Sequence, residues 1–153
     1  MVVKKDDGKL KGGHENLSLE EVRRRMPLLK RVALDAMETY ESRQKHREFL
    51  DELIVISKKF SSPEINETMG RLRREIVEFD RDMEGYDQEV QHLGGFLEDA
   101  AKGLAYFYSE RDGREIYFVW DMSEPELVFW HGREESFSDR LPIEFPEGSQ
   151  ASR

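Results

Sequence analysis

The chain has 153 residues, which is enough for one domain of ordinary size and too few for two enzymes. Charged residues make up 37% and hydrophobic residues 37%, against about 25% and roughly 45 to 50% in typical globular domains, so we expect an elongated or partly unfolded chain. The net charge of -9 argues against duplex nucleic acid and anionic membranes as main partners, because both bind a surplus of Lys and Arg. The absence of cysteine excludes disulfides, thiolate zinc sites and a cysteine nucleophile.

The ends of the chain differ from its middle. Residues 1–16 and 146–153 are polar and carry several glycines or charges, so we expect two disordered tails. Residues 17–145 are predicted to form a single domain, with helices over 17–93 and strands over 94–145. No signal peptide and no run of 18 apolar residues is found, which predicts a cytoplasmic protein.

A capping box opens the first predicted helix. The Ser18 hydroxyl can accept a hydrogen bond from the backbone N–H of Glu21, whose carboxylate can accept one from the N–H of Ser18. Pro27 follows inside the helical pattern, so we expect a kink there or a short leading helix that restarts near it. Apolar residues recur in steps of three and four along one packing stripe: Leu19, Val22, Met26, Leu29, Ala33, Ala36 and Tyr40.

The same stripe resumes one residue out of step later in this helix. Its second part consists of Phe49, Leu53, Ile56 and Phe60. Between the two parts, Arg43 and Arg47 interrupt the apolar pattern. We therefore predict a shift of register in the middle of the helix.

A second helix is predicted to begin at Pro63. Ser62 supplies a suitable N-cap, and proline is favourable at the first helical position. The pattern that follows has strict four-three spacing over Ile65, Met69, Leu72, Ile76, Phe79, Met83, Tyr86, Val90 and Leu93. The arms 27–60 and 63–93 would each span roughly 45 to 50 Å, and a connection of two residues makes them antiparallel. This predicts a long, coiled-coil-like helical hairpin.

Charges support this pairing. Folding the chain about residues 61 and 62 brings together positions whose numbers sum to about 123. Opposite charges then face each other in two sets: Arg71, Arg73 and Arg74 against Glu48, Asp51 and Glu52, and Arg43, Lys45 and Arg47 against Glu78, Asp80 and Asp82. Exposed pairs contribute only about 0.2 to 1 kcal/mol each, so they select the register more than they stabilise it.

Beyond Gly94 and Gly95 the pattern becomes extended. Three aromatic and β-branched runs, 104–108, 116–120 and 127–130, predict strands, and Asp112-Gly113 predicts a tight hairpin turn. We therefore expect an α+β fold in which a three-stranded antiparallel sheet packs with the helical hairpin. Both faces of the sheet are apolar, so the face away from the helices needs cover from residues 137–145, a second subunit or a ligand.

A family resemblance follows from an ordered set of residues. The start over Leu19–Val22 and Met26–Leu29 is similar to Leu/Thr-Glu-Glu-Ala and Leu-Pro-Leu-Val. The C-terminal match consists of Lys102-Gly103-Leu104, Phe107, Arg111-Asp112-Gly113-Arg114-Glu115, Trp120, Glu124-Pro125-Glu126, Trp130-His131, Phe137 and Arg140-Leu141-Pro142-Ile143. On these residues the chain resembles the bacterial domain of unknown function 2203 over about residues 17–143. The resemblance implies the fold and the bacterial cytoplasm, and it implies no particular activity.

The candidate binding residues gather around His131. This histidine ends the third predicted strand, and Asp121 or Glu124 across the preceding turn could hold its imidazole as a base or ligand near neutral pH. Aromatic residues would line this site: Tyr106, Tyr117, Trp120 and Trp130. A hydrogen-bonded structural histidine is the alternative interpretation.

Three further patterns have simpler explanations. Arg111 and Arg114 flank the hairpin turn and could bind a phosphate or carboxylate, although turn chemistry and local ion pairs explain them as well. Glu89 and His92 have metal-ligand spacing, but the helical pattern places them on a solvated surface. The basic cluster of residues 23–25 with Lys30 and Arg31 could contact nucleic acid or an acidic partner, although internal charge balance explains it as well.

We predict a non-enzymatic interaction or scaffold module that associates with itself as a dimer, because its long amphipathic helices expose more apolar surface than a small sheet can cover. The alternative is a small-molecule-binding or metal-binding protein, or an enzyme, with its site around His131. The sequence leaves enzymatic activity open, and it assigns no catalytic residue, metal ligand or cofactor.

Overall fold

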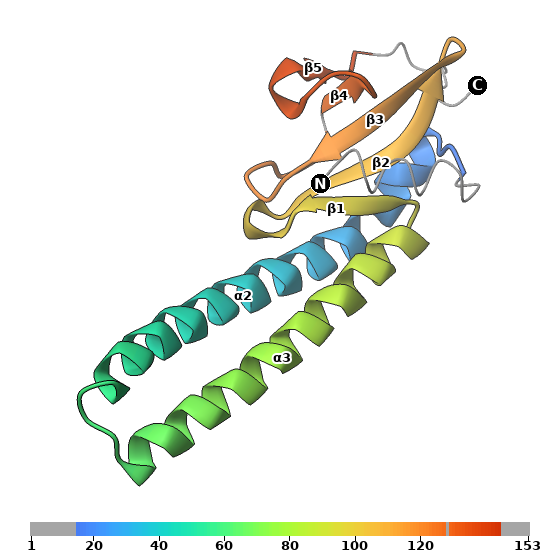
Figure 1. Cartoon of the computed structure of the whole chain (residues 1–153). Helices are drawn as coiled ribbons and strands as arrows, with labels where there is room; N and C mark the ends of the chain where they lie inside the picture. The colour runs from blue at the N-terminus through green and yellow to red at the C-terminus, as the bar shows by residue number, and fades with distance from the viewer. Residues whose placement is uncertain (1–14, 128, 145–153) are drawn as a thin grey trace.

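The computed structural model describes residues 15–127 and 129–144. Two helices, α2 over Leu19–Ser57 and α3 over Pro63–His92, form an antiparallel hairpin, and a single antiparallel sheet lies against the open end of the hairpin (Figure 1). The predicted α+β architecture is therefore confirmed. Residues 1–14 and 146–153 of the two predicted tails lie outside the described residues.

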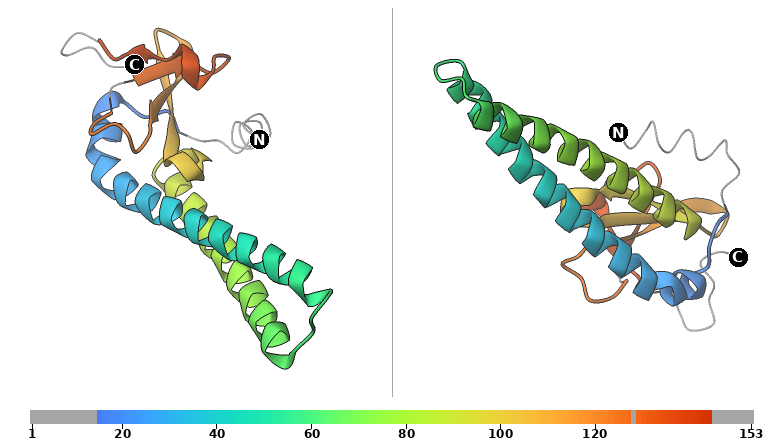
Figure 2. Two further views of the ribbon diagram at one scale, coloured as in Figure 1. Left: turned by 90° about the vertical axis from the view of Figure 1, so that its left-hand side faces the viewer. Right: turned by 90° about the horizontal axis from the view of Figure 1, so that it is seen from below.

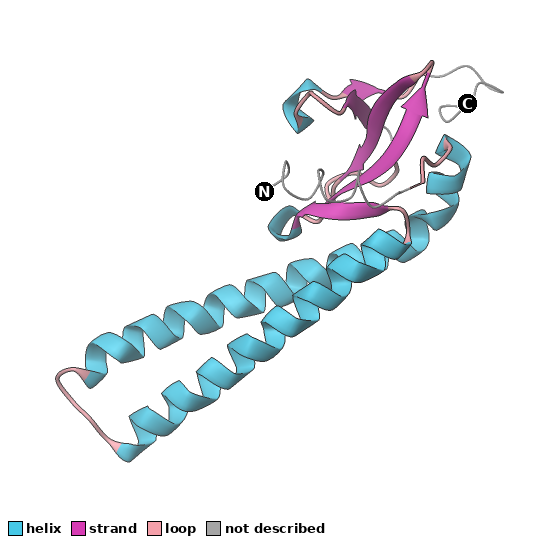
Figure 3. Ribbon diagram, turned by 45° about the vertical axis from the view of Figure 1, so that its right-hand side comes forward, coloured by secondary structure: helices cyan, strands magenta, loops and turns pink. Residues whose placement is uncertain are grey.

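The predicted capping box starts α2. The backbone N–H of Glu21 donates to Ser18 Oγ at 3.0 Å, and the N–H of Ser18 donates to Glu21 Oε1 at 2.8 Å. α2 continues through Pro27 as one helix, so no separate leading helix forms. Its first turns stand at an angle to the long remainder (Figure 3), the kind of bend that a proline inside a helix causes.

The face that α3 turns toward α2 is the predicted one. Ser62 Oγ accepts a hydrogen bond from the N–H of Ile65 at 3.1 Å, and Pro63 occupies the first turn. The buried residues of α3 are Met69, Leu72, Ile76 and Val90. The connection to α2 spans residues 58–62 and not two residues, because α2 ends at Ser57.

Contacts between the helices fix their register. Arg43 Nε lies 2.5 Å from Asp80 Oδ1, which is one of the predicted ion pairs. His46 Nε2 lies 2.8 Å from Glu75 Oε1, so the pairing continues toward the tip. Arg71, by contrast, contacts Glu75 on its own helix at 3.5 Å.

The predicted register shift in α2 is wrong. Leu50 is buried against Met69, Leu72 and Ile76, whereas Phe49 is 45% exposed. Ile56 and Phe60 are exposed as well. The apolar period of α2 continues without a shift past Arg43, because Arg43 pairs with Asp80 of α3 beside the interface between the two helices. Of the predicted second stripe, Phe49, Ile56 and Phe60 are therefore exposed, whereas Leu53 packs against the buried cluster.

The sheet has five strands in the order β1-β2-β3-β4-β5, and not the three predicted. The predicted runs correspond to β2 over Leu104–Arg111, β3 over Arg114–Trp120 and β4 over Phe129–Gly132. β1 over Gly95–Asp99 and β5 over Leu141–Pro142 are the additional strands. Both are edge strands and too short for a clear alternation of side chains. Asp112 and Gly113 have φ values of 54° and 77°, as the predicted hairpin turn requires.

Both faces of the sheet are covered. The inner face packs on the helices through Ala105, Phe107, Ile116, Phe118 and Trp120. The outer face buries Phe96, Leu104, Tyr106, Tyr108, Tyr117 and Val119. Phe137, from the short helical turn η2 over Phe137–Asp139, packs against this outer cluster. Two further views show the hairpin extending well beyond the sheet (Figure 2).

Candidate functional site

His131 lies at the centre of the buried outer face of the sheet. It is on β4, opposite Tyr117 of β3, and none of its surface is exposed. Its ring is 5.2 Å from that of Tyr106 and 5.7 Å from that of Tyr117, both edge to face. A histidine in such surroundings is held in one orientation by packing.

One imidazole nitrogen is committed to the backbone. Nδ1 of His131 lies 2.6 Å from the carbonyl oxygen of Gly132, and since a carbonyl only accepts, Nδ1 carries the proton. Nε2 is then a buried acceptor, and it has no hydrogen-bond partner within residues 15–127 and 129–144. Burial lowers the pKa of His131, which keeps the imidazole neutral, although the Gly132 carbonyl and nearby carboxylates oppose this shift.

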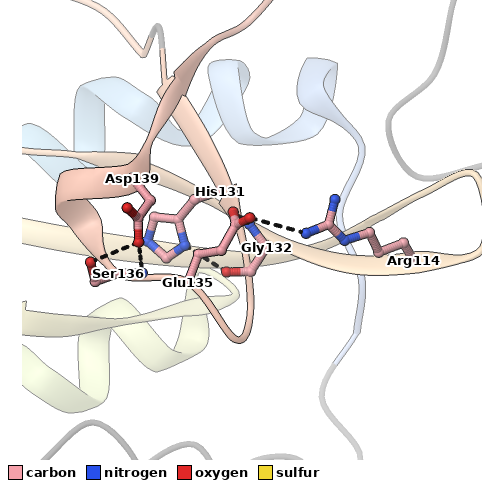
Figure 4. A network of polar contacts seen from close by, with 6 residues as sticks. All are labelled: Arg114, His131, Gly132, Glu135, Ser136 and Asp139. Atoms are coloured by element: carbon pink, nitrogen blue, oxygen red, sulfur yellow. Dashed lines mark hydrogen bonds and ion pairs between the residues drawn. The ribbon is translucent and has the colours of Figure 1, made fainter.

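The nearby carboxylates belong to the loop between β4 and β5 (Figure 4). Glu135 accepts a hydrogen bond from the N–H of Gly132 at 2.8 Å and pairs with Arg114 at 3.4 Å. Asp139 accepts hydrogen bonds from the backbone N–H and the hydroxyl of Ser136, both at 3.1 Å. The bond from the Ser136 N–H is the main reason that the pKa of Asp139 is lowered. Both charges act on His131.

Two arginines stack on aromatic rings of this face. The guanidinium carbon of Arg133 lies 4.9 Å from the Tyr108 ring centre, and its Nη2 donates to Asn16 Oδ1 at 2.9 Å. Arg140 lies 4.0 Å from the ring centre of Phe137 and 4.8 Å from that of Phe129. These contacts place positive charge over the rings of an aromatic cluster, where the ring quadrupole attracts it.

Asp121 and Glu124, the predicted acidic partners of His131, make hydrogen bonds within their own turn. Asp121 Oδ1 accepts from the N–H of Ser123 at 2.9 Å and from its hydroxyl at 2.5 Å, so it shapes its own turn. The backbone oxygen of Glu124 accepts from Trp120 Nε1 at 2.9 Å. Glu135 and Asp139 are the carboxylates that act on the imidazole instead.

The sheet also separates the predicted aromatic lining. Tyr106 and Tyr117 lie on the outer face with His131. Trp120 is part of the inner core, and Trp130 packs against that core from the next strand. Strand alternation causes this separation, because side chains of odd and even positions point to opposite faces.

Arg111 and Arg114 contact different acidic residues. Arg111 Nε lies 3.9 Å from Asp112 Oδ2, whereas Arg114 pairs with Glu135 and lies 5.9 Å from the Trp130 ring centre. Arg111 contacts its sequence neighbour, whereas the partner of Arg114 lies 21 residues away in the loop between β4 and β5. Arg114 thereby connects the hairpin to the loop that covers His131.

Several residues of the site were missed from the sequence: Tyr108, Arg133, Glu135, Asp139 and Arg140. A signal was available for Asp139, because Ser136 and Asp139 have the spacing of a capping box. That pattern predicts a helical turn directly after His131. Arg133 and Arg140 reach these rings from the loop between β4 and β5, and this stacking leaves no pattern in the sequence.

The described residues contain no group of three or more His, Cys, Asp or Glu side chains that could hold a metal ion. Glu89 and His92, which have the spacing of metal ligands in the sequence, are exposed on α3. His92 Nδ1 contacts the backbone oxygen of Gln88 at 2.9 Å. In the basic cluster, Arg25 donates to the backbone oxygen of Leu93 at 2.8 Å, and Lys30 donates to that of Pro125.

A second candidate surface lies near the tip of the hairpin. Phe49, Ile56 and Phe60 are 45%, 43% and 69% exposed. Phe49 and Ile56 lie seven residues apart on one side of α2, and Phe60 follows in the connection to α3. We call these three residues the distal patch. Exposed acidic residues of α2 flank it, and exposed basic residues lie on the neighbouring part of α3: Glu48, Asp51 and Glu52 on α2, and Arg71, Arg73 and Arg74 on α3.

The fold defines an α+β protein in which a projecting helical hairpin carries a small antiparallel sheet. The chain belongs to the family described as "uncharacterized conserved protein (DUF2203)", whose model matches residues 17–143. No curated protein and no solved structure matches the chain. None of the helices in the described part is long and apolar enough to cross a membrane.

Proposed function

We propose that the protein is a non-enzymatic interaction module that forms a dimer through the tip of its helical hairpin. The observation that carries this proposal is the distal patch, where three large apolar side chains are exposed on the arm that extends from the sheet (Figure 1). Contiguous exposed apolar surface of this kind is typical of protein interaction sites.

The distal arm has only a small core of its own. Leu50, Met69, Leu72 and Ile76 form its buried cluster, and the sheet lies at the opposite end of the hairpin. A helical arm is stabilised mainly by packing of its apolar faces, so a partner that covers the distal patch stabilises both helices.

Charge complementarity favours a second copy of the chain as the partner. The acidic residues beside the distal patch lie on α2, whereas the basic residues at the same level lie on α3. In a two-fold pair, α2 of one copy can face α3 of the other, which makes two identical sets of opposite charges. Two hairpins joined in this way form a four-helix bundle.

Light scattering on a size-exclusion column tests the proposal. The wild-type chain is expected to have twice its 18.1 kDa mass at micromolar concentration. Phe49→Glu combined with Phe60→Glu is expected to give a folded monomer, because it places four charges in the two-fold interface. Leu141→Glu is the matched control, since Leu141 is 50% exposed on the sheet, and it should remain a dimer.

Charge reversal tests the pairing itself. Asp51→Arg with Glu52→Arg, and separately Arg73→Glu with Arg74→Glu, should each weaken the homodimer. Mixing the two variants should restore a dimer, since opposite charges then face each other. A monomeric wild type, or a dimer that only Leu141→Glu dissociates, would show that the distal patch is not the interface.

A further inference from the structure

Nε2 of His131 and Nε of Arg140 are among the buried polar atoms that have no hydrogen-bond partner in the described part of the chain. His131 and Phe129 lie two residues apart on the same face of β4, and Arg140 stacks on the Phe129 ring at 4.8 Å. The charge of Arg140 acts on both His131 and Tyr106, so these groups share one environment.

The two atoms require a ligand group with both hydrogen-bonding capacities. Nε2 of His131 can only accept, because Nδ1 carries the proton and donates to Gly132. Nε of Arg140 can only donate. A hydroxyl group donates to the first and accepts from the second, whereas a carboxylate serves only the arginine and an ammonium group only the histidine. Leaving such atoms unsatisfied is costly, which favours an occupant.

The surrounding charges favour a neutral ligand. Glu135 and Asp139 act on His131 against the opposite charge of Arg140, and Glu98 acts on Tyr106 from β1. Arg133 is paired with Glu115. A ligand with a full charge of either sign would therefore lie close to at least one protein group of the same sign. The side chains around the two atoms are aromatic: Tyr106, Tyr117, Phe129 and Phe137.

We propose that His131 and Arg140 bind the hydroxyl group of a small neutral ligand with an aromatic body, a phenol-type molecule. The loop between β4 and β5 lies over this site, with Ser136, Ser138 and Asp139 exposed on it. A ligand has to displace this loop and leaves the strands in place. The site lies on the sheet, so it does not depend on the proposed dimer interface at the hairpin tip.

Nitrogen NMR on the labelled full-length chain tests the proposal with phenol as the probe and benzene as its matched control. Phenol is expected to move the Nε2 resonance of His131 in a saturable manner, and benzene is expected to leave it unchanged. Arg140→Lys keeps the positive charge and removes Nε, so phenol affinity should fall about tenfold. His131→Phe should have a similar effect, while His92→Phe, on the exposed surface of α3, should have none.

Other results overturn the proposal. A phenol-insensitive Nε2 that is already hydrogen-bonded in the free protein means that a buried water fills the site. Equal binding of benzene and phenol means an apolar hollow that does not use either polar atom. The wild-type titration decides between these outcomes even if His131→Phe fails to fold, and neither outcome bears on the dimer.

Discussion

The Nδ1 atom of His131 donates a hydrogen bond to the carbonyl oxygen of Gly132, 2.6 Å away on the next residue. This bond fixes the tautomer of a fully buried imidazole and leaves its second nitrogen without a hydrogen-bond partner among the described residues. Burial lowers the pKa of His131 below the usual 6.5, so the native protein holds this side chain neutral where an unfolded chain would begin to protonate it.

The first prediction concerns stability against pH. As pH falls through about 6.5, the unfolded chain binds a proton at His131 before the native state does, so the free energy of unfolding decreases toward acid. The loss stops growing below the native pKa. Urea unfolding at pH 7, 6 and 5 should show this slope in the wild type and a shallower one in His131→Phe.

The groups that face His131 determine its pKa in the native protein. Burial lowers the pKa of His131, and Arg140 lowers it as well. The Gly132 carbonyl, Glu135 and Asp139 raise this pKa. Tyr106 and Tyr117 face the imidazole with their aromatic rings. Asp139 has a lowered pKa and loses its contribution only at more acidic pH. His92→Phe is the control and should keep the wild-type slope. Identical slopes for His131→Phe and the wild type would contradict the prediction.

The second prediction compares two glycines. A Cβ at Gly95 would lie 2.0 Å from the backbone oxygen of Tyr106, so Gly95→Ala should separate β1 from β2 and destabilise the protein. Gly85 lies inside α3, and a Cβ there meets nothing within 4 Å. Gly85→Ala should therefore stabilise the protein by about 0.5 to 1 kcal/mol through helix propensity. Thermal unfolding of both variants measures whether each substitution raises or lowers the melting temperature. A stabilising Gly95→Ala would contradict the close approach of residue 95 to the backbone of Tyr106.

The sequence predicted those parts of the fold in which a local pattern and the tertiary structure agree. The α3 face at Met69, Leu72 and Ile76 follows a strict spacing, and the same residues are buried. The distal part of α2 could not be predicted in this way, because Leu50 and Phe49 are adjacent apolar residues and only the helix period decides which one meets α3. β1 and β5 form because neighbouring strands pair with them.

The candidate site was predictable only in part for the same reason. His131 was identified as a strand-end histidine, but its acidic neighbours were expected before it in the chain and are found after it. A strand-end residue can be approached from the loop on either side, and the pairing of β4 with β5 places the following loop over the imidazole.

The third prediction concerns the N-cap of α3. Ser62 Oγ accepts the N–H of Ile65 at 3.1 Å, so Ser62→Ala leaves that amide without its side-chain acceptor and should cost about 1 kcal/mol. Ser61→Ala is the matched control, since Ser61 is the exposed residue before the cap. Urea unfolding measures both. Equal effects of the two substitutions would mean that the cap does not stabilise α3.

The fourth prediction concerns the register of the hairpin. Arg43 and Asp80 form an ion pair between the helices at 2.5 Å, with the Asp80 side chain 53% exposed, so their coupling should be about 0.2 to 1 kcal/mol. A double-mutant cycle with Arg43→Ala and Asp80→Ala measures this energy, which should decrease in concentrated salt.

Arg71 provides the comparison for that cycle. It contacts Glu75 on its own helix at 3.5 Å, so a cycle of Arg71→Ala with Glu75→Ala should show coupling. The sequence had placed Arg71 in the basic set that faces Glu48, Asp51 and Glu52, and a cycle of Arg71→Ala with Asp51→Ala should give a coupling near zero. If Arg71 and Asp51 were coupled and Arg43 and Asp80 were not, the helices would pair in a different register. Because the distal patch faces outward only in the present register, that result would also remove the basis for the proposed dimer.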